Sequence, residues 1–119
     1  MDRLDMNKRT MKMALEVIKL TKLFPLCQES KVITYQIIKS ATSTAANYRA
    51  AGRGKSLKDF IAKLGIAEEE CDETIFWLEM ISEANLATLE VTQLIRQETS
   101  EILAIIVTSI KTAKKNLEK

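Results

Sequence analysis

The sequence predicts an all-α protein: an antiparallel, up-and-down four-helix bundle with left-handed crossing that occupies residues 1–119 as a single domain. Three observations lead to this prediction. Apolar residues recur every three or four positions in four long segments. The helix breakers, one proline and three glycines, lie almost entirely at two places. The apolar content of 46% is enough to bury one core in a chain of 119 residues.

The first helix is expected over about residues 6–24. It should end before Pro25, because a proline disfavours helical geometry in the residue before it. Its apolar stripe, which Thr10 interrupts near the start, consists of Met13, Ala14, Val17, Thr21 and Phe24. The second helix is expected over about residues 31–51, with Ser30 as its N-cap and Gly52 and Gly54 at its end. Residues 40–46 are all small, so another helix should approach this surface closely.

The third helix, expected over about residues 57–84, is the longest. Ser56 followed by Asp59 has the spacing of a capping box. Gly65 inside the helix is best explained by close packing. The apolar stripe is Leu57, Phe60, Ile61, Leu64, Ala67, Cys71, Ile75, Leu78 and Ile81.

The fourth helix is expected over about residues 89–115, with Thr88 as its N-cap. Its apolar stripe is Val91, Ile95, Ile102, Ile105, Ile106, Ile110, Ala113 and Leu117. Because four such stripes are joined by short loops, sequence neighbours should be antiparallel and share one core.

Several large apolar residues lie beside these stripes and need another partner. They are Val32 and Ile38 on the second helix and Ile66, Phe76, Trp77 and Met80 on the third. Either the core face is wide, or these residues form a subunit interface, since monomers seldom expose large contiguous apolar patches. We expect a homo-oligomer, with Ile66, Phe76, Trp77 and Met80 as interface candidates.

Charge is unevenly distributed, although the formal net charge is only +2. Positive residues are in excess in residues 1–56, and acidic residues are in excess in residues 57–86. The candidates for nucleic-acid binding are Lys39, Arg49, Arg53 and Lys55. Arg49 could instead pair with acidic residues of the third helix in a neighbouring copy.

The segment 52–56 ends like a Walker A loop, but nucleotide hydrolysis is excluded. Arg49 stands where that motif needs its first glycine, and a helix precedes the loop instead of a strand. The amides at the start of the third helix, beside Arg53 and Lys55, still favour a phosphate or sulfate ion.

The sequence predicts neither an enzyme, nor a metal centre, nor a cofactor. There is no histidine to act as a base or to complete a carboxylate metal site, and Cys27 and Cys71 lack disulfide or zinc-site spacing. The longest apolar run, residues 102–107, is far shorter than the roughly 18 residues of a membrane span. The charged residues near the start do not resemble a secretion signal, so we expect a cytoplasmic protein without membrane contact.

The chain resembles bacterial four-helix bundle proteins that are also called ribosomal RNA intervening-sequence proteins. The resemblance is carried by residues 40–49, Arg53, Ser56, and residues 60–64, 66–74 and 77–79, and more loosely by residues 23–25 and the fourth helix. It implies a non-enzymatic bundle that assembles into a homopentamer. A related branch, the accessory variability proteins of diversity-generating retroelements, associates with a reverse transcriptase and nucleic acid. Family members commonly have glutamate where this chain has Ala50.

Two functions therefore remain open. The first is an oligomer that binds RNA or DNA through repeated basic sites without reading its sequence. The second is a protein-interaction scaffold without nucleic-acid binding, whose partner could be a reverse transcriptase by family analogy. The low net charge keeps the scaffold open, because dedicated nucleic-acid-binding proteins are usually more basic.

Overall fold

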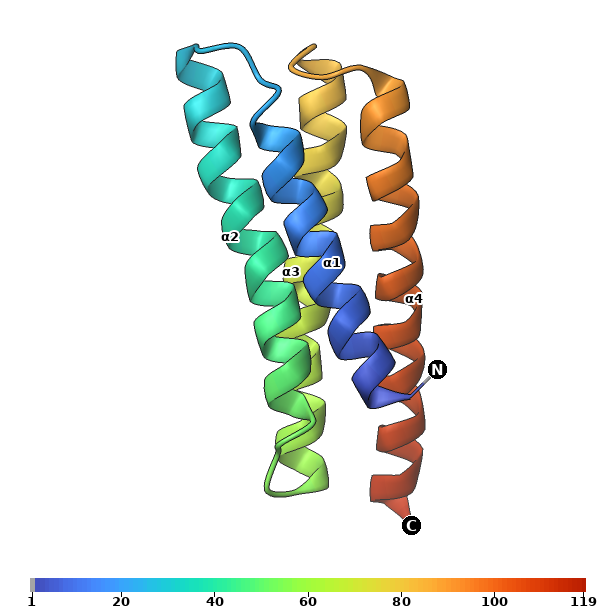
Figure 1. The fold of residues 1–119 in the computed structure, drawn as a ribbon. Coiled ribbons are helices and arrows are strands. Elements are labelled where there is room, and N and C mark those ends of the chain that lie inside the picture. The colour runs from blue at the N-terminus through green and yellow to red at the C-terminus, as the bar shows by residue number, and fades with distance from the viewer. Residues whose placement is uncertain (1) are drawn as a thin grey trace.

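The computed structural model describes residues 2–119, which fold into an elongated bundle of four helices (Figure 1). The helices are α1 (Arg3–Thr21), α2 (Gln28–Ala51), α3 (Leu57–Glu83) and α4 (Leu89–Glu118). Helices α1 and α3 each pack against α2 and α4, and sequence neighbours run antiparallel. The prediction of an all-α four-helix bundle is confirmed.

The two ends of the bundle carry different parts of the chain. The start of α1, the end of α4 and the α2–α3 loop lie toward one end, and the α1–α2 and α3–α4 loops lie at the other (Figure 1). The bundle measures 52 × 22 × 21 Å along its principal axes. Within residues 2–119, none of the helices has the length and apolarity needed to cross a membrane.

The junction of α1 and α2 differs from the prediction. Helix α1 ends at Thr21, and the amides of the next three residues form a turn with carbonyls three positions earlier. Helix α2 already begins at Gln28, with Cys27 as its N-cap, so the prediction of Ser30 as N-cap is wrong. The Ser30 hydroxyl instead accepts from the Cys27 amide (3.3 Å) and lies 2.7 Å from the Pro25 carbonyl oxygen, to which it can donate. Ser30 therefore lies in the first turn of α2, where its hydroxyl accepts from the amide of the N-cap residue, as in a capping box.

Helix α1 begins at Arg3, three residues earlier than predicted, because the Asp2 carboxylate accepts a hydrogen bond from the Asp5 amide and caps the helix there. The starts of α3 and α4 agree with the sequence. The Ser56 hydroxyl accepts a hydrogen bond from the Asp59 amide (3.1 Å), and the Thr88 hydroxyl accepts from the Val91 amide (3.3 Å). Helix α3 ends in a turn at Asn85, whose φ of 59° is left-handed. The Leu86 amide then donates to the Ile81 carbonyl (3.0 Å), which satisfies a group that the helix end would leave free.

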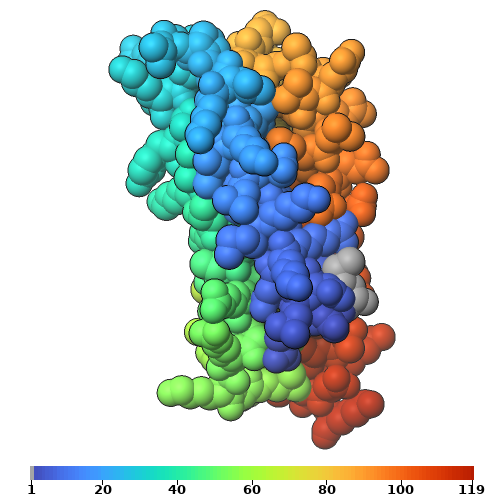
Figure 2. All heavy atoms as spheres, viewed as in Figure 1, coloured from blue at the N-terminus to red at the C-terminus, as the bar shows by residue number. Residues whose placement is uncertain are grey.

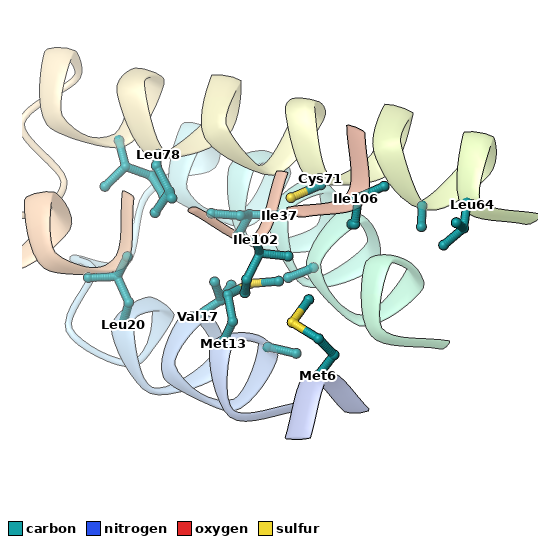
Figure 3. Close-up of a cluster of buried hydrophobic side chains, with 14 of the residues drawn as sticks. Met6, Met13, Val17, Leu20, Ile37, Leu64, Cys71, Leu78, Ile102 and Ile106 are labelled. Carbon is teal, nitrogen blue, oxygen red and sulfur yellow. The ribbon is translucent and has the colours of Figure 1, made fainter. Parts of the chain in front are cut away.

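The core runs along the bundle axis and receives side chains from every helix (Figure 3). Its fully buried members include Met6, Met13, Val17 and Leu20 from α1, Ile37 from α2, Leu64, Cys71 and Leu78 from α3, and Ile102 and Ile106 from α4. These residues follow the apolar stripes that the periodicity predicts, with Met6 and Leu20 added on α1, where the predicted Thr21 and Phe24 are only partly buried.

Threonines in the core correct parts of the predicted stripes. Thr10, Thr74 and Thr92 are buried, whereas Ile75 is only partly buried and Val91 is exposed. Leu57 and Leu117 are likewise exposed. A buried threonine is tolerated because its hydroxyl donates to a carbonyl one turn earlier, as Thr10 does to Met6 (3.0 Å), while its methyl group packs like that of valine.

The small residues of α2 form the close seam that the sequence predicts. Ser40, Ala41 and Thr44 are fully buried, and α2 packs most extensively against α3. The Thr74 hydroxyl on α3 donates to the Ser40 hydroxyl at 2.8 Å. The prediction for Gly65 is wrong, because a Cβ built there meets nothing within 4 Å. Gly65 faces open space rather than a packed helix within the bundle.

Candidate functional site

A groove between α1 and α2 has apolar walls and positively charged rims. It lies toward the end of the bundle where α2 enters the α2–α3 loop. Its apolar lining is Leu4, Met11, Ala14, Ala45, Ala46 and Ala50. Its charged lining is Lys8, Arg49, Arg53 and Lys63, and no acidic residue within residues 2–119 lines it. We call this surface the basic groove.

The positive charge of the basic groove is only slightly neutralised from within the chain. Lys63 pairs with Asp59 at 3.6 Å on a partly exposed surface. Within the part of the chain that the structure describes, neither Arg49 nor Arg53 forms an ion pair. Both guanidinium groups are therefore available to an anionic partner.

The structure separates the four nucleic-acid candidates. Arg49 and Arg53 both line the basic groove, but Lys39 and Lys55 do not. Lys39 lies near Glu70 of α3: burial and the neighbouring Glu73 raise the pKa of Glu70, and Lys39 opposes that rise. Sequence reasoning missed Lys8 and Lys63, because they come from α1 and α3 and only the packing of the helices brings them to α2. No periodic pattern in the sequence links Lys8 and Lys63 to Arg49 and Arg53.

The start of α3 differs from the expected phosphate site. The carboxylate of Asp59 accepts a hydrogen bond from the Lys55 amide (3.2 Å), while Ser56 caps the Asp59 amide. An acidic side chain of the protein thus occupies part of the position that a phosphate would take. Gly54 lets the chain turn closely here, because a Cβ would lie only 3.1 Å from both the Ala51 carbonyl oxygen and the Asp59 carboxylate.

A second surface lies on α3 and consists of acidic and large apolar residues. Ile66, Phe76 and Met80 are 46%, 49% and 37% exposed. Together with Glu69 and Glu73 they are spaced by three or four positions, so they share one face of the helix. We call these five residues, Ile66, Glu69, Glu73, Phe76 and Met80, the acidic ridge.

Trp77 differs from the other three interface candidates. Its side chain is partly buried and packs against the core, and its indole nitrogen donates to the Glu73 carboxylate at 3.3 Å. The rings of Phe76 and Trp77 meet edge to face at 4.8 Å between their centroids. Trp77 therefore supports Phe76 from inside the bundle, and the exposed part of the candidate interface consists of Ile66, Phe76 and Met80.

The remaining reactive groups are surface carboxylates and the thiols of Cys27 and Cys71. Within residues 2–119, no three histidine, cysteine, aspartate or glutamate residues are placed to hold a metal ion. Burial raises the pKa of the Cys71 thiol to about 12, and this thiol donates to the Thr99 carbonyl at 3.4 Å. A protonated, buried thiol is a poor nucleophile.

Comparisons with known proteins agree with this architecture. A family model described as 23S rRNA-intervening sequence protein matches residues 2–108. Among solved structures, the chain is similar to a protein of unknown function from the S23 ribosomal protein family of Bacteroides thetaiotaomicron. The two chains share 34% identity and superpose with a TM-score of 0.80 over 89% of this chain and 98% of the other. No curated protein matches the chain.

Proposed function

Because this chain belongs to the 23S rRNA-intervening sequence protein family, we propose that it is a non-enzymatic, cytoplasmic bundle that works as a homo-oligomer. The number of subunits is five by family analogy. Assembly is supported by the basic groove and the acidic ridge, which both combine exposed apolar and charged side chains.

One observation carries this proposal: the chain has two exposed, partly apolar surfaces that its own helices leave uncovered. Ile66, Phe76 and Met80 are at least 37% exposed, and they lie together on one face of a long helix. Water contact with such a face is unfavourable, so a protein partner that covers it gains hydrophobic free energy. Self-association provides that partner in every cell that makes the protein.

The test is the mass of the native protein in solution. Sedimentation velocity at micromolar concentration should give a species several times heavier than the 13.4 kDa chain, and five times heavier if the family analogy holds. A single species of 13.4 kDa over a wide concentration range would refute the proposal.

Binding of RNA or DNA is a second candidate function, favoured by the positive groups of the basic groove. A polyanion bound there would release counterions, so its affinity would fall steeply with salt. The double variant Arg49→Ala/Arg53→Ala should then weaken RNA binding and reduce its salt dependence. Lys39→Ala/Lys55→Ala is the matched comparison, because both lysines lie outside the groove. No binding at low salt would leave the scaffold role, in which the assembly holds a protein partner such as a reverse transcriptase.

A further inference from the structure

We infer that the acidic ridge of one copy packs into the basic groove of the next copy. This inference rests on the proposed self-assembly and names the two surfaces that carry it. The contact joins two different surfaces, so each copy offers a ridge to one neighbour and a groove to the other.

Charge complementarity is the first argument. The groove carries Arg49 and Arg53, and no carboxylate of the described chain lines it. The ridge carries Glu69 and Glu73 between its apolar residues. Opposite charges on two partly apolar surfaces select this pairing and disfavour groove against groove or ridge against ridge.

Size and shape give the second argument. Three alanines of α2, Ala45, Ala46 and Ala50, line the groove and leave room for large side chains. The ridge offers such side chains in Ile66, Phe76 and Met80. Residues 4–14 of α1 span about 15 Å and residues 66–80 of α3 span about 21 Å, so the ridge is long enough to fill the whole groove. Large residues of one helix would thus enter the space above small residues of another.

The position of the two surfaces gives the third argument. The groove lies on the face formed by α1 and α2, and α3 is largely hidden behind that face (Figure 2). The ridge residues point away from the core side of α3, so a chain cannot place its own ridge in its own groove. A contact between two different surfaces joins copies head to tail, and such a contact closes into a ring when the rotation between copies permits.

A second copy fits the groove better than RNA does. The RNA backbone would use the cations but would gain little from the alanine wall, because phosphates and sugars are polar. It would also leave Ile66, Phe76 and Met80 exposed. Only a partner with both acidic and large apolar groups uses everything that the groove offers, and the chain itself carries such a surface.

Charge reversal on each surface tests the inference. The groove variant is Arg49→Glu/Arg53→Glu, and the ridge variant is Glu69→Lys/Glu73→Lys. Each should raise the dissociation constant of the contact by about a hundredfold or more, because like charges then face each other. The variant with all four substitutions should assemble again, since its charges are again complementary. Circular dichroism should show that all three remain helical.

Two control variants make the same changes of charge at exposed positions of α4, away from the groove and the ridge. Lys111→Glu/Lys114→Glu matches the groove variant, and Glu90→Lys/Glu118→Lys matches the ridge variant. Both controls should sediment like the unchanged protein. This result would show that position, rather than net charge, controls assembly.

The outcomes separate this inference from the proposed function. If the unchanged protein is monomeric, both are refuted. If it assembles and either reversal leaves assembly intact, the inference alone is refuted and another face joins the copies. Failure of the fourfold variant to recover would also refute the ridge-to-groove pairing. If the ridge variant still assembles while the groove variant loses only RNA binding, the groove belongs to RNA.

Discussion

Arg9 joins α1 to α4 through the most extensive ion-pair network in the bundle. Its Nε and one Nη donate to the two carboxylate oxygens of Glu98, both at 2.7 Å, and the same Nη donates to Glu101 at 2.8 Å. The packing of α1 against α4 is the least extensive of the four helix contacts. The stability of this side of the bundle should therefore depend on Arg9 more than on any other charged residue.

We expect Arg9→Met to destabilise the fold by about 2 kcal/mol. The magnitude follows from burial: the Arg9 side chain is 18% exposed, while Glu98 and Glu101 are 36% and 54% exposed. Exposed ion pairs contribute about 0–1 kcal/mol and removal of one partner of a buried pair costs about 3–5 kcal/mol, so this network lies between them. For a chain of this size the melting temperature should fall by about 8 °C.

The loss of stability in Arg9→Met should become smaller as the pH falls. Hydrogen bonds from Arg9 lower the pKa of Glu98 below its ordinary value of 4.5 in the folded protein. The stabilisation is therefore fully present above the unfolded pKa and is lost as the pH falls through the folded pKa. The difference between the unchanged protein and Arg9→Met should be large at neutral pH and should shrink as the pH falls below the ordinary glutamate pKa of 4.5.

Urea denaturation followed by circular dichroism measures this effect. Both proteins must be compared at the same subunit concentration, because assembly adds to apparent stability. A double-mutant cycle with Glu98→Gln should give a coupling of about 1 kcal/mol, and Arg9→Lys should lose less than Arg9→Met, since it keeps the charge. A loss below about 0.5 kcal/mol at neutral pH, typical of an ordinary surface substitution, would refute the reasoning.

Three further predictions concern single residues. Gly65→Ala should add about 1 kcal/mol to the free energy of unfolding, because a Cβ there meets no atom within 4 Å; no gain in urea denaturation would contradict this. Asn85→Gly should add about 0.5 kcal/mol, because glycine adopts the φ of 59° without strain; an unchanged or lower melting temperature would count against it. Cys27 should react with a thiol reagent much faster than Cys71, because burial raises the pKa of the Cys71 thiol to about 12. Equal reaction rates of the two thiols in the native protein would contradict the burial of Cys71.

The fold could be predicted from the sequence because its signals are local. Apolar spacing gave the four helices, and the side-chain caps of Ser56 and Thr88 gave two of the starts. The predicted start of α2 was wrong because the Ser30 hydroxyl can bond to residues before it or after it in the chain. Residue spacing alone does not distinguish these two arrangements. The core threonines were missed because a pattern of apolar residues does not count a hydroxyl that the helix backbone satisfies.

The candidate surfaces could be predicted only in part, because they depend on which helices meet. Ile66, Phe76 and Met80 stood out as apolar residues beside the main stripe, and their exposure agrees with that reasoning. The basic groove combines Lys8 of α1 with Arg49 of α2 and Lys63 of α3. Residues so far apart in sequence become one surface only through the packing of the bundle, which no single segment encodes.

The mass of the intact assembly, compared between the unchanged protein and Glu69→Lys/Glu73→Lys, tests the central claim most directly. Sedimentation equilibrium should give a multiple of 13.4 kDa for the unchanged protein and a shift toward 13.4 kDa for the ridge variant. The same mass for both proteins, whether that of an oligomer or of a single chain, would contradict the account.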